Sequence, residues 1–248
     1  MLLTTAYFPP IEYFALLAKY SVVYMEACEN YQKQSWRNRC RILSANGPLD
    51  LNVPVVHEGG TFALPVKQIR VEYSTPWVLR TERAIESAYC SSPFFIYYRD
   101  ALFEILDSHP ATLWELNRRI IDFFCARIGI APDIRETAEY VVPTGAASAS
   151  LTASQLRSLG PTADAVPPLS RGWRRSCEAD AAPEACLPEG DFRAAIHPKR
   201  PNTILHDMGL DRPYWQVFRE KYGFVPGLSI MDLLFNEGPE SICWIRSV

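Results

Sequence analysis

The spacing of apolar residues divides the chain into a strand-rich first part, a helical middle and a shorter helical end. Two short apolar runs, 2–6 and 21–25, are typical of buried strands. Between them, 11–19 carries apolar residues at helical spacing and predicts an amphipathic helix that starts after the breaker Pro9-Pro10. The chain is therefore expected to begin with a strand, a helix and a second strand.

Two further strand patterns follow in the first part. Segments 37–43 and 49–55 flank Asn46-Gly47, a dipeptide that favours positive φ and indicates a hairpin. Apolar and polar residues then alternate over 67–73, which predicts a half-buried strand. The apolar face of that strand would comprise Ile69, Val71 and Tyr73.

Helical patterns fill the middle of the chain. A hydroxyl residue precedes a proline at Thr75-Pro76 and at Ser92-Pro93, and each pair predicts a capped helix start. Thr112 and Glu115 have the spacing of a capping box, and Gly129 is placed to end that helix. We therefore expect three consecutive helices between residues 75 and 129.

The order of elements predicts an α/β or α+β fold, with N-terminal mixed strands and a hairpin, central helices and a C-terminal helical segment. The C-terminal helices are expected at 213–221 and 229–235. Ala, Pro, Gly and Ser make up more than half of 143–190, which leaves too little apolar surface to offset the entropy of ordering. We therefore expect one domain, 1–248, with 143–190 as a long flexible insertion that acts as a linker or as a lid.

Composition limits the class of protein. The chain has 248 residues, 48% hydrophobic and 21% charged, with a formal net charge of −3. These values exclude fibrous and wholly disordered proteins, and a pI near 5.9 argues against binding of bulk nucleic acid. The first residues lack a basic n-region, and no apolar run approaches about 18 residues, so neither a signal peptide nor a membrane span is expected. With seven irregularly spaced Cys, the expected setting is the cytoplasm; the oligomeric state is left open.

The segment 31–41 is the densest polar constellation, with four basic residues and no acid. On a strand, Arg37, Arg39 and Arg41 would share one face, whereas on a helix Lys33, Arg37 and Arg41 would align. Either arrangement gives a cationic face that suits phosphate or carboxylate groups. A solvated basic edge strand explains the same pattern without a ligand.

A second constellation follows the insertion, where His197 and Lys199 flank Pro198. His197 could act as a general base or as an oriented hydrogen-bond donor, although a lone His more often has a structural role. Lys199 could hold an anionic group. Asn38 and Gln216 could orient a substrate through neutral hydrogen bonds.

Cys40 is the best nucleophile candidate among the cysteines, because neighbouring Arg side chains would lower its thiol pKa if it is partly exposed. A small buried hydrophobic residue on the inner side of a strand is the alternative. The sequence lacks CxxC, HxH and HExxH patterns, phosphate-binding glycine loops and GxSxG. Accordingly, neither a metal site nor a cofactor is expected.

Several motifs, taken in order, resemble the WbqC-like family of bacterial proteins, and most closely its short stand-alone members in Bacteroidetes. The matching stretches are Tyr7-Phe8-Pro9 with Tyr13-Phe14, Lys33-Gln34-Ser35 with Arg37-Asn38-Arg39, 51–55, Trp77 with Ala88-Tyr89, 92–95, Tyr214 with 216–218, and 228–238. The resemblance spans about 1–130 and 191–241. One departure concerns the middle helix: where related short members carry a His followed by Trp, this chain has Thr81 and Glu82.

The resemblance implies a role in O-antigen, lipopolysaccharide or other surface-glycan biosynthesis, and some family members are called glycine transferases. The first hypothesis is therefore an aminoacyl (glycine) or acyl transferase acting on an amino sugar, a small-molecule substrate that could be nucleotide-linked. Lys33, Arg37, Arg39 and Lys199 would bind anionic groups, His197 would deprotonate the acceptor amine, and Cys40 could carry the acyl group. This mechanism requires the segments around 31–41 and 191–199 to meet in one site.

Two other hypotheses use the same residues differently. A non-catalytic binding protein of glycan or envelope metabolism would need only the basic anion-binding face, and the residues at 81 and 82 favour it. A cysteine peptidase-like hydrolase would need a His and an Asp or Asn beside a Cys.

Overall fold

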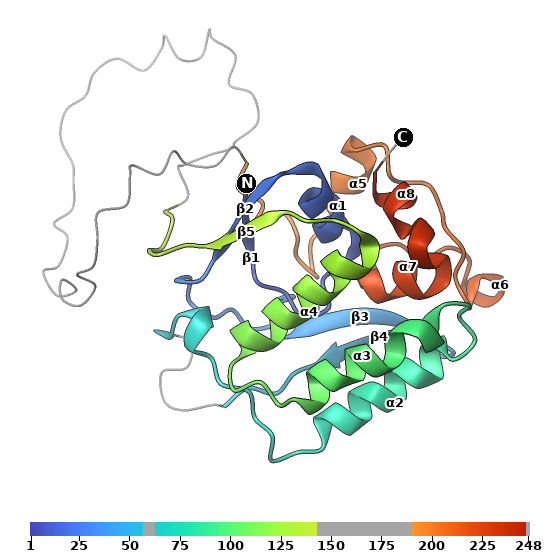
Figure 1. Ribbon diagram of the computed structural model, residues 1–248, viewed down its shortest axis with the longest axis horizontal. Helices are drawn as coiled ribbons and strands as arrows, with labels where there is room; N and C mark the ends of the chain where they lie inside the picture. Colours follow the sequence, from blue (N-terminus) through green and yellow to red (C-terminus); the bar gives the residue numbers. More distant parts are fainter. Residues whose placement is uncertain (57–62, 143–189, 247–248) are drawn as a thin grey trace, which may run out of the picture. The chain divides into compact units, whose positions relative to one another are not determined.

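The computed structural model describes residues 1–56, 63–142 and 190–246. Contacts divide the chain into two units. The first unit comprises Met1–Val141 and Pro188–Val248, and the second comprises Val142–Leu187. All elements described below belong to the first unit. Apart from Gly190, the predicted insertion 143–190 lies outside the described residues, so its role stays a prediction. In chain order (Figure 1), the elements are β1 (Leu2–Thr4), α1 (Ile11–Lys19), β2 (Val22–Glu26), β3 (Arg39–Ser44), β4 (Gly47–Asn52), η2 (Val66–Gln68), α2 (Trp77–Tyr89), α3 (Phe95–Asp107), α4 (Leu113–Ile128), β5 (Asp133–Glu136), α5 (Ile204–Asp207), α6 (Arg219–Tyr222), α7 (Ile230–Glu237), η4 (Gly238–Glu240) and α8 (Ser241–Ile245).

A parallel sheet holds the start of the chain. Strand β2 lies between β1 and β5, with Leu3 opposite Met25 and Val23 opposite Ile134. Parallel strands need a crossover, and α1 supplies it between β1 and β2. The predicted strand–helix–strand start is confirmed, and the mixed α/β class with it.

The predicted hairpin is confirmed as β3 and β4, which pair antiparallel with Ser44 opposite Gly47. The loop is therefore Ala45-Asn46, one residue earlier than the dipeptide that indicated it. Gly47, at φ 104°, takes the positive φ that the turn needs, a conformation that glycine adopts without steric cost.

Three helices form the middle of the chain, as predicted, but only one has the expected cap. Thr112 accepts a hydrogen bond from the Glu115 backbone N–H (3.2 Å), and Gly129 ends α4 at φ 84°. The caps predicted at Thr75 and Ser92 are wrong, because α2 follows Pro76 and α3 follows Phe94 with no side-chain cap bond. Helix α2 packs against β3, and α3 packs against α4 and α7.

The strand predicted over 67–73 is wrong, although its pattern of burial is right. Ile69 and Val71 are buried while Arg70 is exposed, but the segment holds η2 and isolated bridges instead of a strand. Val71 pairs with Val55 on one side, and Arg70 pairs with Thr112 on the other. Alternating burial therefore arises from single contacts on both sides of an irregular segment.

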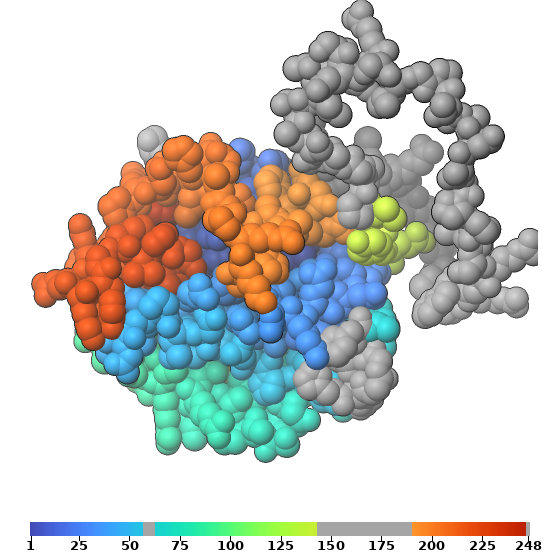
Figure 2. All heavy atoms as spheres, turned by 180° about the vertical axis from the view of Figure 1, so that it is seen from behind, coloured from blue at the N-terminus to red at the C-terminus, as the bar shows by residue number. Residues whose placement is uncertain are grey.

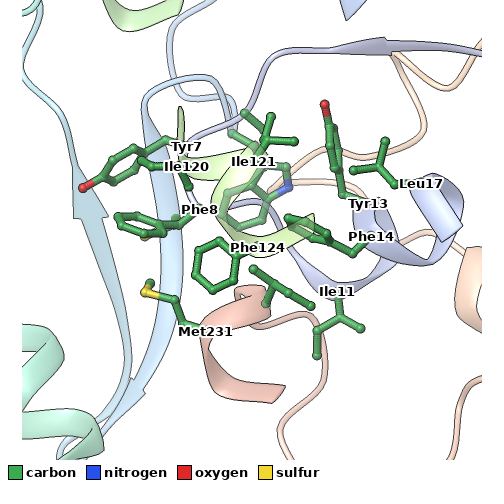
Figure 3. Packing of buried hydrophobic residues seen from close by; sticks show 14 of the residues in the cluster. Tyr7, Phe8, Ile11, Tyr13, Phe14, Leu17, Ile120, Ile121, Phe124 and Met231 are labelled. Carbon is green, nitrogen blue, oxygen red and sulfur yellow. The ribbon is translucent and has the colours of Figure 1, made fainter. Parts of the chain in front are cut away.

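The C-terminal helices cover the core. The helix predicted over 213–221 is reduced to α6, whereas α7 matches the prediction for 229–235 and starts at the cap Ser229. Figure 3 shows Met231 of α7 near Phe8 and Phe124, with Phe14 beside them. The Phe8 and Phe124 rings meet edge to face at 6.1 Å between centroids, and Phe14 contacts Phe124 in the same way at 5.9 Å. This aromatic core joins α1, α4 and α7.

Candidate functional site at the carboxyl ends of the parallel strands

The segment that begins at Gly190 returns to the start of the parallel sheet. The Leu2 backbone N–H donates to the Gly190 carbonyl, and the Phe192 N–H donates to the Leu2 carbonyl, both at 3.0 Å. Figure 2 shows this orange segment lying directly against the blue N-terminal residues. The sheet thereby fixes the position of 190–192.

A buried carboxylate at the end of β2 holds this return segment. Glu26 is 0% exposed and accepts hydrogen bonds from the Thr137 hydroxyl (2.7 Å), the Val141 N–H (2.9 Å) and Arg193 Nη1 (3.1 Å). Arg193 also binds Asp191 through Nη2 at 2.7 Å. Since Val141 and Arg193 lie on either side of residues 143–189, one carboxylate joins the segments before and after them to β2.

The turn His197–Arg200 lies at the outer end of the return segment. The Arg200 N–H donates to the His197 carbonyl (3.1 Å), and the Lys199 N–H donates to His197 Nδ1 (3.1 Å). Partial burial lowers the pKa of His197, and the nearby cations Arg200, Arg37 and Lys199 lower it further. The His197 imidazole therefore lies in a region of positive potential.

The two segments that the transfer hypothesis requires together do meet. Lys199 Nζ donates a hydrogen bond to Gln34 Oε1, and Arg37 is close enough to His197 to act on its charge. Gln34 is exposed and has φ 57°, a conformation that non-glycine residues rarely adopt outside constrained turns. The contact lies at the surface, where a ligand can reach both segments.

Arg37 does not share the exposed face of the hairpin. Its side chain is 5% exposed and forms a two-point ion pair with Glu29, with Nε–Oε1 at 2.9 Å and Nη2–Oε2 at 2.6 Å. Burial raises the pKa of Glu29, and the hydrogen bonds and charge of Arg37 oppose this. The prediction that Arg37 lies on one strand face with Arg39 and Arg41 is wrong, because β3 starts only at Arg39 and Arg37 turns inward to a buried acid.

Arg39 and Arg41 do lie on one face of β3, as predicted, and both contact residues of β4. Arg39 Nε donates to Asn52 Oδ1 (2.9 Å), and Arg41 binds Asp50 through two nitrogens at 2.7 and 3.1 Å. Asn38 donates to the Val53 carbonyl at 2.9 Å. These bonds stabilise the pairing of the hairpin, so an anionic ligand would have to compete with them or add to them.

An open groove of about 520 Å³ extends from this hairpin to the start of α2. Its bases are Lys33, Arg39 and Arg80, and none of the described residues that line it is acidic. Gln34 also lines it, so the contact with Lys199 connects the groove to the His197 turn. Trp77 lines the groove as well; it is 5% exposed, and its indole N–H has no hydrogen-bond partner among the described residues.

The structure places Cys40 away from this surface. Cys40 is 1% exposed on the inner side of β3, and burial raises the pKa of its thiol well above the ordinary value, with the Asp50 charge adding to the effect. The partial exposure on which its nucleophilic role depended is absent. No His is among the groups that shift the Cys40 pKa, so the hydrolase hypothesis gains no support at this residue.

Gln216 belongs to an internal network. It is 1% exposed, its Nε2 donates to Asp232 Oδ2 (3.0 Å) and to the Val225 carbonyl (2.9 Å), and its Oε1 accepts from the Val225 N–H (2.9 Å). The Tyr214 hydroxyl donates to the same Asp232 oxygen at 2.6 Å. These contacts bind the loop before α7 to its first turn and leave Gln216 outside the groove.

Sequence reasoning missed the polar residues at the strand ends. In a parallel sheet, the carboxyl ends meet at one edge, where α/β proteins commonly bind ligands. Thr5, Glu26 and Thr137 lie at the three ends, and Asn117 of α4 donates to Thr5 Oγ1 (3.1 Å) and to the Arg37 carbonyl (2.8 Å). The available signal was an acid at the end of an apolar strand pattern, as at Glu26.

The two residues of α2 that differ from the related short proteins, Thr81 and Glu82, lie in different surroundings. Thr81 is 4% exposed and contacts the Tyr7 side chain, whereas Glu82 is partly exposed. Burial raises the pKa of Glu82, and the neighbouring acids Asp107 and Glu86 raise it further. Position 81 therefore faces the core one helical turn after Trp77.

Within 1–56, 63–142 and 190–246, no cluster of three or more His, Cys, Asp or Glu side chains could hold a metal ion. None of the helices in this part of the chain is long and apolar enough to cross a membrane.

Comparison with known proteins gives one family and one uncharacterised relative. The model of the WbqC-like protein family matches residues 5–165. An uncharacterized protein of Mycobacterium tuberculosis (strain ATCC 25618 / H37Rv), Rv1507c, is 28% identical over 241 residues, which cover 97% of this chain and 94% of the relative. No solved structure matches. Since the family model covers more than half of the sequence, the chain belongs to the WbqC-like protein family.

Proposed function

We propose that the protein transfers an aminoacyl group, such as glycine, or an acyl group to an amino sugar of surface-polysaccharide biosynthesis. The contact between Lys199 and Gln34 carries this proposal, because it joins the His197 turn to the basic groove at an accessible surface. A transferase needs a site for the charged part of its substrate beside the groups that act on the reacting atoms.

In this proposal, the groove holds the phosphate of a nucleotide-linked or lipid-linked sugar. Lys33, Arg39 and Arg80 supply the positive charge. Arg37 contributes indirectly, because its pairing with Glu29 sets the shape of the loop before β3. The amine of the sugar would then lie toward His197.

A non-catalytic binding protein is the second candidate, and two observations favour it. The Cys40 thiol is buried, and His197 Nδ1 already accepts the Lys199 N–H. Neither group is therefore positioned as a nucleophile or as an unoccupied base. Binding of the same phosphate-linked sugar without turnover would use the groove unchanged.

The test combines native mass spectrometry with isotope transfer. The purified protein is incubated with bacterial extract and labelled glycine, re-isolated and analysed for bound phosphosugars, while the extract is analysed for labelled amino sugars. The transferase proposal expects a bound phosphate-containing sugar and label in an amide of that sugar. A bound sugar without label would favour the binding protein, and neither signal in repeated preparations would refute both.

Two exposed helical arginines provide matched variants. Arg80→Gln removes one charge from the groove, whereas Arg127→Gln removes one from α4, where the guanidinium lies over the Phe123 ring. Loss of one phosphate contact should weaken sugar binding about tenfold in the first variant, and the second variant should bind like the wild type. Equal effects of the two changes would contradict the assignment of the groove.

A further inference from the structure

The turn at His197 determines which ring nitrogen carries the proton. Pro198 fixes φ near −65° at the second position of the turn, and the Arg200 N–H closes it on the His197 carbonyl. In this geometry, the Lys199 N–H donates to His197 Nδ1 at 3.1 Å. A neutral imidazole has one donor and one acceptor nitrogen, so the proton lies on Nε2.

The charges around the ring favour this neutral form. Arg200 and Lys199 face it from the same turn, and Arg37 faces it from the segment before β3. No acid is among the groups that shift the pKa of His197, and Glu29, the acid next to Arg37, is engaged by it in a two-point ion pair. Partial burial and the three cations lower the pKa of His197, so the ring is neutral near pH 7.

We propose that His197 acts as a neutral hydrogen-bond donor, through Nε2–H, to an anionic oxygen of the ligand that Lys199 and Arg200 also contact. The shared ligand chemistry is an oxyanion, either a phosphate or a carboxylate oxygen. That this oxyanion belongs to a sugar substrate rests on the proposed function, whereas the donor role does not.

The donor role excludes His197 as the base that takes a proton from the acceptor amine. Accepting a proton at Nε2 requires that Nε2 first be unprotonated, which would place the proton on Nδ1. Nδ1–H would then face the Lys199 N–H, and two donors cannot bond to each other. The turn would have to open before His197 could act as a base.

The tautomer can be measured without any assay of activity. In protein labelled with ¹⁵N-histidine, long-range ¹H–¹⁵N correlations distinguish Nε2–H from Nδ1–H, and the signals of His197 are those absent from His197→Gln. The proposal expects an unprotonated Nδ1 in His197 at neutral pH. An Nδ1–H tautomer would overturn it.

His206 is the internal reference for the titration. It is exposed, and its hydrogen bond and charge interaction with Asp211 (2.8 Å) raise its pKa. His197 should therefore gain its proton at a lower pH than His206 in the same sample. Titration of His197 above His206 would contradict the positive surroundings on which the donor role depends.

Two substitutions separate a donor from a base. In His197→Gln, the amide nitrogen can take the place of Nε2–H, whereas in His197→Asn the side-chain oxygen can keep the bond to the Lys199 N–H but offers no donor at the Nε2 position. Binding of inorganic phosphate and of acetate, followed by NMR shifts, tests the two kinds of oxyanion separately.

The donor role predicts that His197→Gln binds the preferred anion within about fivefold of the wild type, and that His197→Asn binds it about tenfold more weakly. Preference for phosphate or for acetate identifies the oxyanion. Equal losses in both variants, or no binding of either anion to the wild type, would overturn the donor role. The glycine-transfer experiment is independent of these outcomes, so the two proposals can fail separately.

Discussion

Replacing Asp232 by Asn should stabilise the protein at neutral pH and have little effect in acid. Asp232 lies in the first turn of α7, is 1% exposed, and accepts hydrogen bonds from Tyr214 and Gln216. Burial raises the pKa of this carboxyl from 3.8 to about 6, while the hydrogen bonds from Tyr214 and Gln216 and the nearby Tyr89 hydroxyl act in the opposite direction. The network therefore satisfies the carboxylate only in part.

The size of the effect follows from the two pKa values. The folded protein holds the Asp232 proton up to about pH 6, whereas the unfolded chain loses it near pH 3.8. The stability that the neutral carboxyl contributes is present below 3.8 and is lost as the pH rises through about 6. The difference corresponds to about 3 kcal/mol of unfolding free energy.

Urea denaturation of wild type and Asp232→Asn from about pH 3.5 to 7 measures this effect directly. The stability of the variant relative to the wild type should rise by about 3 kcal/mol over that range, because Asn stays neutral and its oxygen can accept the same bonds. Asp100→Asn, at a side chain that is 82% exposed, is the control and should leave the pH dependence unchanged. If the unfolding free energy of Asp232→Asn relative to the wild type stays constant or falls with rising pH, the argument is refuted.

Three further changes test the contacts that position the site and the helices. Glu26→Gln should lower the unfolding free energy by about 3 kcal/mol, because it leaves Arg193 short of a buried partner; unchanged stability in urea would contradict the role of this carboxylate. Gly238→Ala should destabilise by more than about 2 kcal/mol, since a Cβ would come within 2.5 Å of the Phe94 ring at φ 55°, and a melting temperature equal to that of the wild type would show that the ring can move. Thr112→Ala should cost about 1 kcal/mol by removing the cap of α4, as measured by thermal unfolding, and no loss would mean that the cap bond is replaced by water.

Local sequence patterns correctly predicted those elements whose formation depends mainly on residues close together in the sequence. The strand–helix–strand start and the hairpin follow from period and turn chemistry, and the cap at Thr112 follows from its own helix. The caps at Thr75 and Ser92 failed because the helices begin later than the proline pattern suggested. The strand predicted from the alternation over 67–73 was wrong, because apolar residues can be buried on one face of a segment that has no partner strand.

The site was predicted less completely, because its contacts span long stretches of sequence. Lys199 and Gln34 were both within segments that the sequence singled out, and they do meet. Glu26 was not singled out, since its partner Arg193 is 167 residues away and no local pattern records that pairing. Gln216 was assigned to a ligand because an isolated Gln gives no sign of the buried Asp232 that engages it.

The same long-range pairing changes what the basic segment can do. Arg37 is used by Glu29, and Arg39 and Arg41 both face Asp50, at 3.7 and 2.7 Å. A guanidinium that is already paired with a carboxylate gains less from a further anion than one that is not, because part of its charge and hydrogen-bonding capacity is already used. Beside Lys33, the positive potential available to a ligand therefore comes largely from cations outside 31–41, such as Arg80 in the groove and the turn at His197. A cluster of bases in the sequence thus locates the surface, while the acids that fold against it decide which cations remain to bind.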